Sequence, residues 1–248
     1  MKYFLVLLSV IFLGCEKPSD CTKSTGKIVS KEIDFSATPF DKILIFKGIG
    51  LVIKQGNDYK VEIKTGENLI NDIQATVTGN KLTLQDNTTC NWVRDYGQTV
   101  VYITTPNLTE IYSKTEQNII SNGVLTFPSL RLVALDKYDG LKDSATGDFI
   151  LQIDNASLTL ENNYISNFII TGQTQNLNIN VYEGNGVIDT RNLVSKKIEV
   201  YHRGSNKVFV NPVEEITGDI YNIGDVFCVS RPAIHPVIEH YRGRFIFL

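Results

Sequence analysis

Four aspartates lie close together in the middle of the chain, where carboxylates could bind a cation or cleave a glycosidic bond. They are Asp136, Asp139, Asp143 and Asp148. Paired carboxylates can hold Ca²⁺ or serve as the acid and the base of sugar cleavage. Their spacing is irregular and matches no calcium-binding loop, and acidic turns with glycine are also typical of a solvated surface loop. We therefore expect neither a metal nor a catalytic role for this segment.

The chain has three histidines, His202, His235 and His240, and they offer little metal chemistry. His235 and His240 lie on either side of Pro236 and lack a third ligand at a useful spacing. The sequence also has no Gly-x-Ser-x-Gly elbow, no His-Glu-x-x-His motif and no phosphate-binding glycine loop. We therefore predict a protein without catalytic residues, metal or cofactor.

Four tyrosines, each followed closely by a glycine, recur at intervals of about twenty residues in the last third of the chain. They are Tyr182, Tyr201, Tyr221 and Tyr241. Their parity is opposite to that of the neighbouring inward-facing apolar residues, so they should line one outer face. Stacked aromatic side chains stabilise a fold by roughly 0.5–1.5 kcal/mol per pair, and that alone could explain them. The alternative is a binding strip in which Tyr182, Tyr201 and Tyr221 contact sugar rings or a partner protein.

Trp92 is the only tryptophan and lies in an unusual polar segment, residues 87–96, that also holds Cys90. It could contact a partner, or it could pack over a disulfide or over one end of the fold. Cys21 and Cys90 have polar, loop-like surroundings, and a disulfide between them would tie the N-terminal segment to the body; two free thiols are the alternative. Cys228 lies in an apolar run and is expected in the core.

The N-terminus predicts export and lipid anchoring. Lys2 precedes an apolar run at residues 3–13, which is shorter than the roughly 20 residues of a membrane-spanning helix but fits a secretory signal. Leu13-Gly14-Cys15 resembles a bacterial lipobox, in which the cysteine is lipidated; an ordinary signal peptide with an incidental cysteine is the alternative. We expect a signal peptide at residues 1–14, lipidated Cys15 and a polar tether at 15–26, and a folded domain at 27–248. The expected location is the cell envelope, at the outer membrane.

The composition allows one sizeable core and argues against nucleic-acid binding. Hydrophobic residues make up 42% of the chain, and no change in composition suggests a second domain. The net charge is −3, and the concentrated basic surface that a phosphate backbone needs is not visible. The expected partners are a membrane, through the lipid, and a glycan or an envelope protein.

Alternation of apolar and polar residues dominates the chain, and helical periodicity is almost absent. Short apolar runs follow one another about ten residues apart from residue 159 to residue 227. A β-helix with two or more strands per twenty-residue turn explains this spacing, because each residue then lies above its equivalent in the previous turn. A β-sandwich also alternates, but it has no reason to keep a constant period.

Two inward columns of side chains follow from the twenty-residue period. The first should contain Phe168, Ile188, Val208 and Cys228. The second should contain Leu160, Val200 and Ile220, with a one-residue slip near Asn180. An open coil exposes unpaired strand edges, so we expect both ends to be capped. The apolar C-terminal residues 245–248 should dock as a final strand, with an antiparallel orientation as one option.

The segment FDKILIFKGIGLVIKQG, residues 40–56, combines Phe-Asp, an alternating strand, a glycine corner, a second strand and Gln-Gly. It resembles the opening of the "putative auto-transporter adhesin, head GIN domain" family, and residues 59–63, 67–70, 82–84 and 101–108 are also similar to that family. The likeness is good over residues 40–108 and looser to about residue 230. It implies an all-β fold, a single-stranded right-handed β-helix (solenoid) on an envelope-anchored bacterial protein, and it supplies no catalytic residue.

These features favour a non-catalytic, lipid-anchored binding or adhesin-like protein that presents one face of a β-helix, with Tyr182, Tyr201, Tyr221 and Trp92 as candidate contact residues. One alternative is a carbohydrate-active enzyme of the polysaccharide lyase or hydrolase type, since sugar lyases use coils of this shape. Another is a structural envelope component without a ligand. The enzyme requires acids and a basic residue that converge in a groove, whereas the binding protein requires an exposed aromatic strip.

Overall fold

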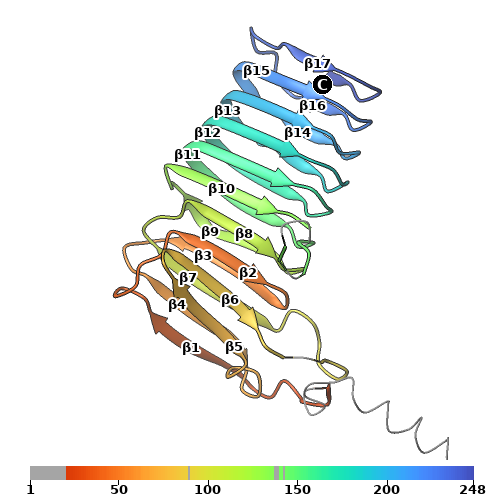
Figure 1. The fold of residues 1–248 in the computed structure, drawn as a ribbon. Helices are drawn as coiled ribbons and strands as arrows, with labels where there is room; N and C mark the ends of the chain where they lie inside the picture. The colour runs from red at the N-terminus through yellow and green to blue at the C-terminus, as the bar shows by residue number, and fades with distance from the viewer. Residues whose placement is uncertain (1–20, 89, 137–139, 142) are drawn as a thin grey trace, which may run out of the picture.

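The computed structural model describes residues 21–248 except residues 89, 137–139 and 142, and its fold is all-β, as predicted. Its 18 strands form one strongly curled sheet, which extends in Figure 1 from β1 near the N-terminus to β17 near the C-terminus. The strands are β1 (Ile28–Asp34), β2 (Lys42–Phe46), β3 (Ile49–Gln55), β4 (Lys60–Gly66), β5 (Ile73–Thr78), β6 (Lys81–Asp86), β7 (Thr99–Thr105), β8 (Glu110–Lys114), β9 (Ile119–Leu125), β10 (Ser129–Ala134), β11 (Phe149–Asn162), β12 (Phe168–Val181), β13 (Ile188–His202), β14 (Val208–Val210), β15 (Pro212–Ile220), β16 (Val226–Cys228), β17 (Val237–Glu239) and β18 (Phe245–Phe247).

Two ladders of strands run along the sheet. The first has the order β5–β6–β2–β8–β10–β11–β12–β13–β15–β17. The second has the order β1–β4–β7–β3–β9–β11–β12–β13–β14–β16–β18. The long strands β11, β12 and β13 belong to both ladders. All pairings from β8 to β18 are parallel, and we call each level of this parallel stack a rung (Figure 1).

The first predicted inward column is confirmed at three of its four positions. Phe168 pairs with Ile188, and Ile188 pairs with Val208; all three are fully buried. Cys228 does not continue the column, because Val208 pairs with Val226. The rung that ends in β16 is shorter than the twenty-residue period, so Val226 takes this position and Cys228 is buried one inward position further along the strand.

The second predicted column contains the expected slip. Leu160 pairs with Ile179, and Ile179 pairs with Val200, so an isoleucine fills the inward position in β12. Ile220 lies outside this column, because Val200 pairs with Gly218 in β15. The alternation of inward and outward residues therefore persists through the stack, while the number of residues per rung varies.

The N-terminal third departs from the predicted twenty-residue coil. Strands β1, β4 and β7 pair in antiparallel fashion, and β5 and β6 form an antiparallel hairpin. Lys42 of β2 lies between Lys81 of β6 and Glu110 of β8, so neighbours in this part of the sheet are far apart in sequence. The turn of the β5–β6 hairpin contains Gly79 at φ 63°, a conformation that glycine adopts without strain. These antiparallel strands close the N-terminal end of the stack.

The C-terminal end of the stack is built differently from the N-terminal end. β18 is docked on the stack, and it runs parallel to β16 rather than antiparallel. β17 pairs with β15, and neither β17 nor β18 has a second neighbour among the strands of the described residues. The final strand is therefore the last rung of the stack, with one edge open. The predicted cap at this end is wrong for the described residues, because no further strand covers β17 or β18.

Asparagine and aspartate side chains link successive rungs at one corner of the stack. The Asn118 Oδ1 atom accepts the Asp148 N–H at 3.2 Å. One rung further on, Asp148 Oδ1 accepts from Asn167 Nδ2 at 2.9 Å, and Asn167 Oδ1 accepts the Val187 N–H at 2.8 Å. Turn backbone groups that no strand can pair are thereby satisfied.

Candidate functional site

The three tyrosines predicted to contact a partner come together on one outer edge of the stack. Tyr182 follows β12, Tyr201 lies near the end of β13, and Tyr221 follows β15. The ring centroids of Tyr182 and Tyr201 are 6.2 Å apart, and those of Tyr201 and Tyr221 are 5.3 Å apart. Tyr182 and Tyr221 each expose 41% of their surface. The rings form a continuous row that solvent can reach.

His240, rather than Tyr241, extends this row. The His240 ring stacks on the Tyr221 ring with centroids 4.3 Å apart and planes 5° apart. The backbone register explains the contact, because the His240 N–H donates to Ile220 O at 2.8 Å and so places His240 beside Tyr221. We define the aromatic strip as Tyr182, Tyr201, Tyr221 and His240.

A charged network continues from Tyr182 toward the earlier rungs. The Tyr182 hydroxyl lies 3.3 Å from Glu161 Oε2. Arg131 binds Glu161 through Nε and Nη2 at 2.7 and 2.8 Å, and Glu110 through Nη1 at 2.6 Å. Hydrogen bonding to Glu161 raises the pKa of Arg131, while burial, followed by the charge of Glu161, raises the pKa of Tyr182. Both carboxylates are ion-paired with one arginine, so neither resembles a free catalytic acid.

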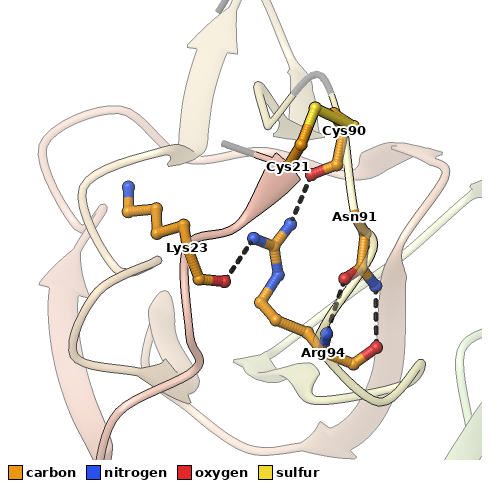
Figure 2. The surroundings of a disulfide bond; sticks show 5 residues. All are labelled: Cys21, Lys23, Cys90, Asn91 and Arg94. Atoms are coloured by element: carbon orange, nitrogen blue, oxygen red, sulfur yellow. Dashed lines mark hydrogen bonds between the residues drawn. A yellow bond between two sulfur atoms is a disulfide. The ribbon is translucent and has the colours of Figure 1, made fainter. Parts of the chain in front are cut away.

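Trp92 is separated from the aromatic strip by several strands of the first ladder, because it lies in the β6–β7 loop. Cys21 and Cys90 form a disulfide with their Cα atoms 4.5 Å apart (Figure 2). The Trp92 N–H donates to Cys21 O at 3.0 Å, but the Trp92 residue is 77% exposed. The indole is therefore available to a partner instead of packing over the disulfide, and it belongs to a different surface from the tyrosines.

The segment predicted as a tether at residues 15–26 contacts the body where the structure describes it. Cys21 is buried, and Lys23 Nζ lies 2.7 Å from Asp72 Oδ2. Asn68 Nδ2 donates to Ser24 O at 3.0 Å. Cys15 and the predicted signal peptide lie outside the described residues. Within those residues, no helix has the length and apolar character needed to cross a membrane.

The described aspartates of residues 136–148, which are Asp136, Asp143 and Asp148, do not gather into one metal site. Asp136 accepts a hydrogen bond from Ser144, and Asp148 links neighbouring rungs. Asp143 has a positive φ of 67° in its loop, and Asp139 lies outside the described residues. No cluster of three or more His, Cys, Asp or Glu side chains suited to a metal occurs in the part of the chain that the structure describes.

Residues 39–232 match the family model described as "Putative auto-transporter adhesin, head GIN domain". The chain belongs to this family. The matched region contains the three tyrosines of the aromatic strip and Trp92, and it confirms the resemblance expected from residues 40–108. No curated protein matches the chain in sequence.

Solved structures similar to this family member share its fold at low sequence identity. A putative adhesin from Bacteroides fragilis NCTC 9343 has a TM-score of 0.78 and 17% identity, covering 91% of this chain and 99% of that chain. A putative adhesin from Parabacteroides merdae ATCC 43184 has a TM-score of 0.58 and 17% identity, covering 92% and 100%. A putative lipid binding protein from Parabacteroides distasonis ATCC 8503 has a TM-score of 0.61 and 14% identity, covering 91% and 98%. The likeness concerns the fold.

Sequence reasoning missed two contributors to the surface of this family member. His240 breaks the tyrosine pattern in the sequence, although it follows Tyr221 by one rung. Glu161 gave no signal, because its partner Arg131 is far away in sequence and reaches it only through the pairing of β10 with β11. The two residues are 30 positions apart, so the predicted twenty-residue spacing does not bring them together.

Proposed function

We propose that this protein is a non-catalytic, adhesin-like binding protein of the cell envelope and that the aromatic strip is its binding face. The observation that supports this most is the row of four partly exposed rings on successive rungs from Tyr182 to His240. Flat apolar ring faces, with the carboxylates of Glu161 and Asp219 beside them, suit a glycan or the surface of an envelope protein. The ion pairing of Glu110 and Glu161 gives the enzyme alternative no support at this surface.

The envelope location is supported by the Cys21–Cys90 disulfide, because disulfides persist mainly in oxidising compartments. The adhesin description of the family points the same way. We propose that Cys15 carries the lipid and that the anchor is in the outer membrane. The parent chain should then be found in the membrane fraction of the cells, and the Cys15→Ser variant should be lost from that fraction. Equal distribution of the parent and the variant would contradict the anchor.

We also infer that the rungs from β8 to β18 wind as a right-handed β-helix. The uninterrupted parallel pairing supports this, since connections between parallel strands are right-handed in about 98% of cases. A crystal structure of the chain would test the handedness, and a left-handed winding would refute it.

The binding face can be tested with alanine variants of the full-length protein on a glycan array and in pull-downs from envelope extracts. Tyr182→Ala combined with Tyr221→Ala should weaken binding at least about tenfold, because two exposed ring faces are lost. Tyr102→Ala is the matched control, since Tyr102 is 37% exposed in β7 on the second ladder. If the double variant binds every partner of the parent protein with parental affinity, the aromatic strip is not the binding face.

A further inference from the structure

A cavity of about 390 Å³ lies near the N-terminal end of the sheet, several strands away from the aromatic strip. The β2–β3 turn, at Lys47 and Gly48, lines one side of it. The loop after β6 and the β8–β9 turn at Glu116 line the others. Its volume is within the range of roughly 300–1,000 Å³ that is usual for small-molecule sites.

The loop that forms one wall of the cavity is held in place by its own contacts (Figure 2). The Arg94 guanidinium donates to Lys23 O at 2.9 Å and to Cys90 O at 2.8 Å, so it bridges the two segments that the disulfide joins. The Asn91 side chain accepts the Arg94 N–H at 2.8 Å and donates to Arg94 O at 2.9 Å. A wall fixed in this way is preorganised, and a ligand would lose little free energy by ordering it.

Three carboxylates face this space from different elements: Asp86, Asp95 and Glu116. Asp86 is half-buried and accepts the Thr88 N–H at 2.8 Å, and burial raises its pKa. Glu116 Oε2 accepts the Gly48 N–H at 3.2 Å. A carboxylate has about four lone-pair sites, so both groups retain acceptor capacity for the hydroxyl groups of a ligand.

An aromatic side chain adds a flat apolar surface to this set of acceptors. Tyr96 lines the cavity and is 80% exposed, which is unusual for a side chain of its size. Gln98 adds an amide and Lys47 an ammonium group to the lining. The lining carboxylates outnumber the lining cations, Lys47 and Arg94, so the charge of the cavity disfavours anionic ligands.

We propose that this cavity binds one neutral glycosyl unit, whose hydroxyl groups donate to Asp86 and Glu116 while its ring packs on Tyr96. The proposal does not rest on the aromatic strip, because the two sites share no residue. It adds a second binding site to the proposed function, near the disulfide-bonded end of the molecule.

Trp92 supplies a reporter for this site, because it is the only tryptophan of the chain and lies in the same loop. The full-length protein in mild detergent would be titrated with methyl glycosides of glucose, galactose, mannose and N-acetylglucosamine. Trp92 fluorescence and calorimetry would be recorded in parallel, with glucuronate and inorganic phosphate as anionic probes. We expect saturable binding of at least one neutral glycoside with a Kd of about 1–10 mM, the weak range of a single sugar unit.

Tyr96→Ala removes the proposed ring contact, and Asp86→Asn replaces a charged acceptor with a weaker neutral one. Each variant should therefore weaken this binding at least about fivefold. Tyr102→Ala is the control and should bind with the parental Kd, since Tyr102 is an exposed tyrosine of β7 that lines neither the cavity nor the aromatic strip. The proposal fails if no neutral glycoside gives saturable heat, if both cavity variants bind as the parent does, or if glucuronate or phosphate binds more tightly than every neutral glycoside. Loss of cavity binding in Tyr96→Ala with retained partner binding at the aromatic strip would separate the two sites.

Discussion

His202 shows how a side chain that looks reactive in the sequence can be structural. It is fully buried, its Nε2 lies 3.0 Å from Asn206 O, and its Nδ1 accepts the Gly204 N–H at 3.3 Å. These two contacts fit the neutral tautomer that carries the proton on Nε2, since Nδ1 must accept. Burial lowers the pKa of this imidazole, so the folded protein resists protonation there.

This burial predicts a loss of stability in mild acid. Below about pH 6.5 the unfolded chain gains a proton on His202 that the folded chain does not, so the free energy of unfolding should fall by up to about 1.4 kcal/mol per pH unit. The loss should level off once the pH is below the lowered pKa of the folded state. In urea unfolding between pH 7.5 and pH 4.5, His202→Gln should show a shallower dependence on pH than the parent. Equal slopes would mean that His202 does not contribute.

Residue spacing predicted part of the candidate site. The interval of about twenty residues between Tyr182, Tyr201 and Tyr221 sufficed to predict that their rings lie together. The alternation along each strand makes them face outward, and the interval is about the length of one rung. The place of His240 in the row could not be predicted, since the last rungs are shorter than twenty residues and shift the register. The exposure of Trp92 depends on contacts between the β6–β7 loop and Cys21, which the local sequence does not reveal.

At the scale of strands, two glycines with positive φ make a matched pair. Gly218 in β15 has φ 136°, and a Cβ there would lie 1.9 Å from Val200 O on the neighbouring rung. Gly123 in β9 has φ 93°, and a Cβ there would meet no atom within 4 Å. Both positions disfavour other residues through their backbone conformation, but only Gly218 is also needed for close approach of two rungs.

We predict that Gly123→Ala lowers the free energy of unfolding by about 1–2 kcal/mol through the positive φ alone. Gly218→Ala should cost roughly a further 1–3 kcal/mol, because the added methyl group overlaps a backbone oxygen and the rungs must separate. Urea unfolding of both variants beside the parent measures the difference. Similar losses in the two variants would show that β13 and β15 can separate to accommodate the methyl group without a further loss of stability.

The strand pattern was predictable where each rung repeats the one before it. From β11 onward, the alternation of apolar and polar residues and the twenty-residue interval predicted which residues face inward. The predicted positions differ from the observed ones by at most two residues, as at Cys228. The N-terminal strands were harder, because short alternating strands look the same whether their neighbours are parallel or antiparallel. Only the turn at Gly79 marks a hairpin locally, and the pairing of β1 with β4 leaves no signal of this kind.

For the whole molecule, the Cys21–Cys90 disulfide is the strongest constraint outside the core. It joins residues separated by 69 positions, and it holds the first described residues against the loop that precedes β7. We predict that replacing both cysteines with serine lowers the free energy of unfolding by about 2–4 kcal/mol. Hydrogen exchange should show faster opening of β1 and the β6–β7 loop, with unchanged protection in β12 and β13. Uniform loss of protection along the chain would contradict this local role.

With the proposed lipid anchor at Cys15, the same disulfide would determine how mechanical tension passes from the N-terminus into the domain. A pull that reaches Cys21 crosses the sulfur–sulfur bond to Cys90 and continues toward β7, so strands β1 to β6 form a bypassed covalent loop. Tension reaches those strands only through their hydrogen bonds to β7 and later strands. Reduction would release a loop of 69 residues, about 230 Å of additional extended chain. The redox state of two sulfur atoms would therefore set how far the domain could extend from the proposed anchor at Cys15 before its rungs begin to separate.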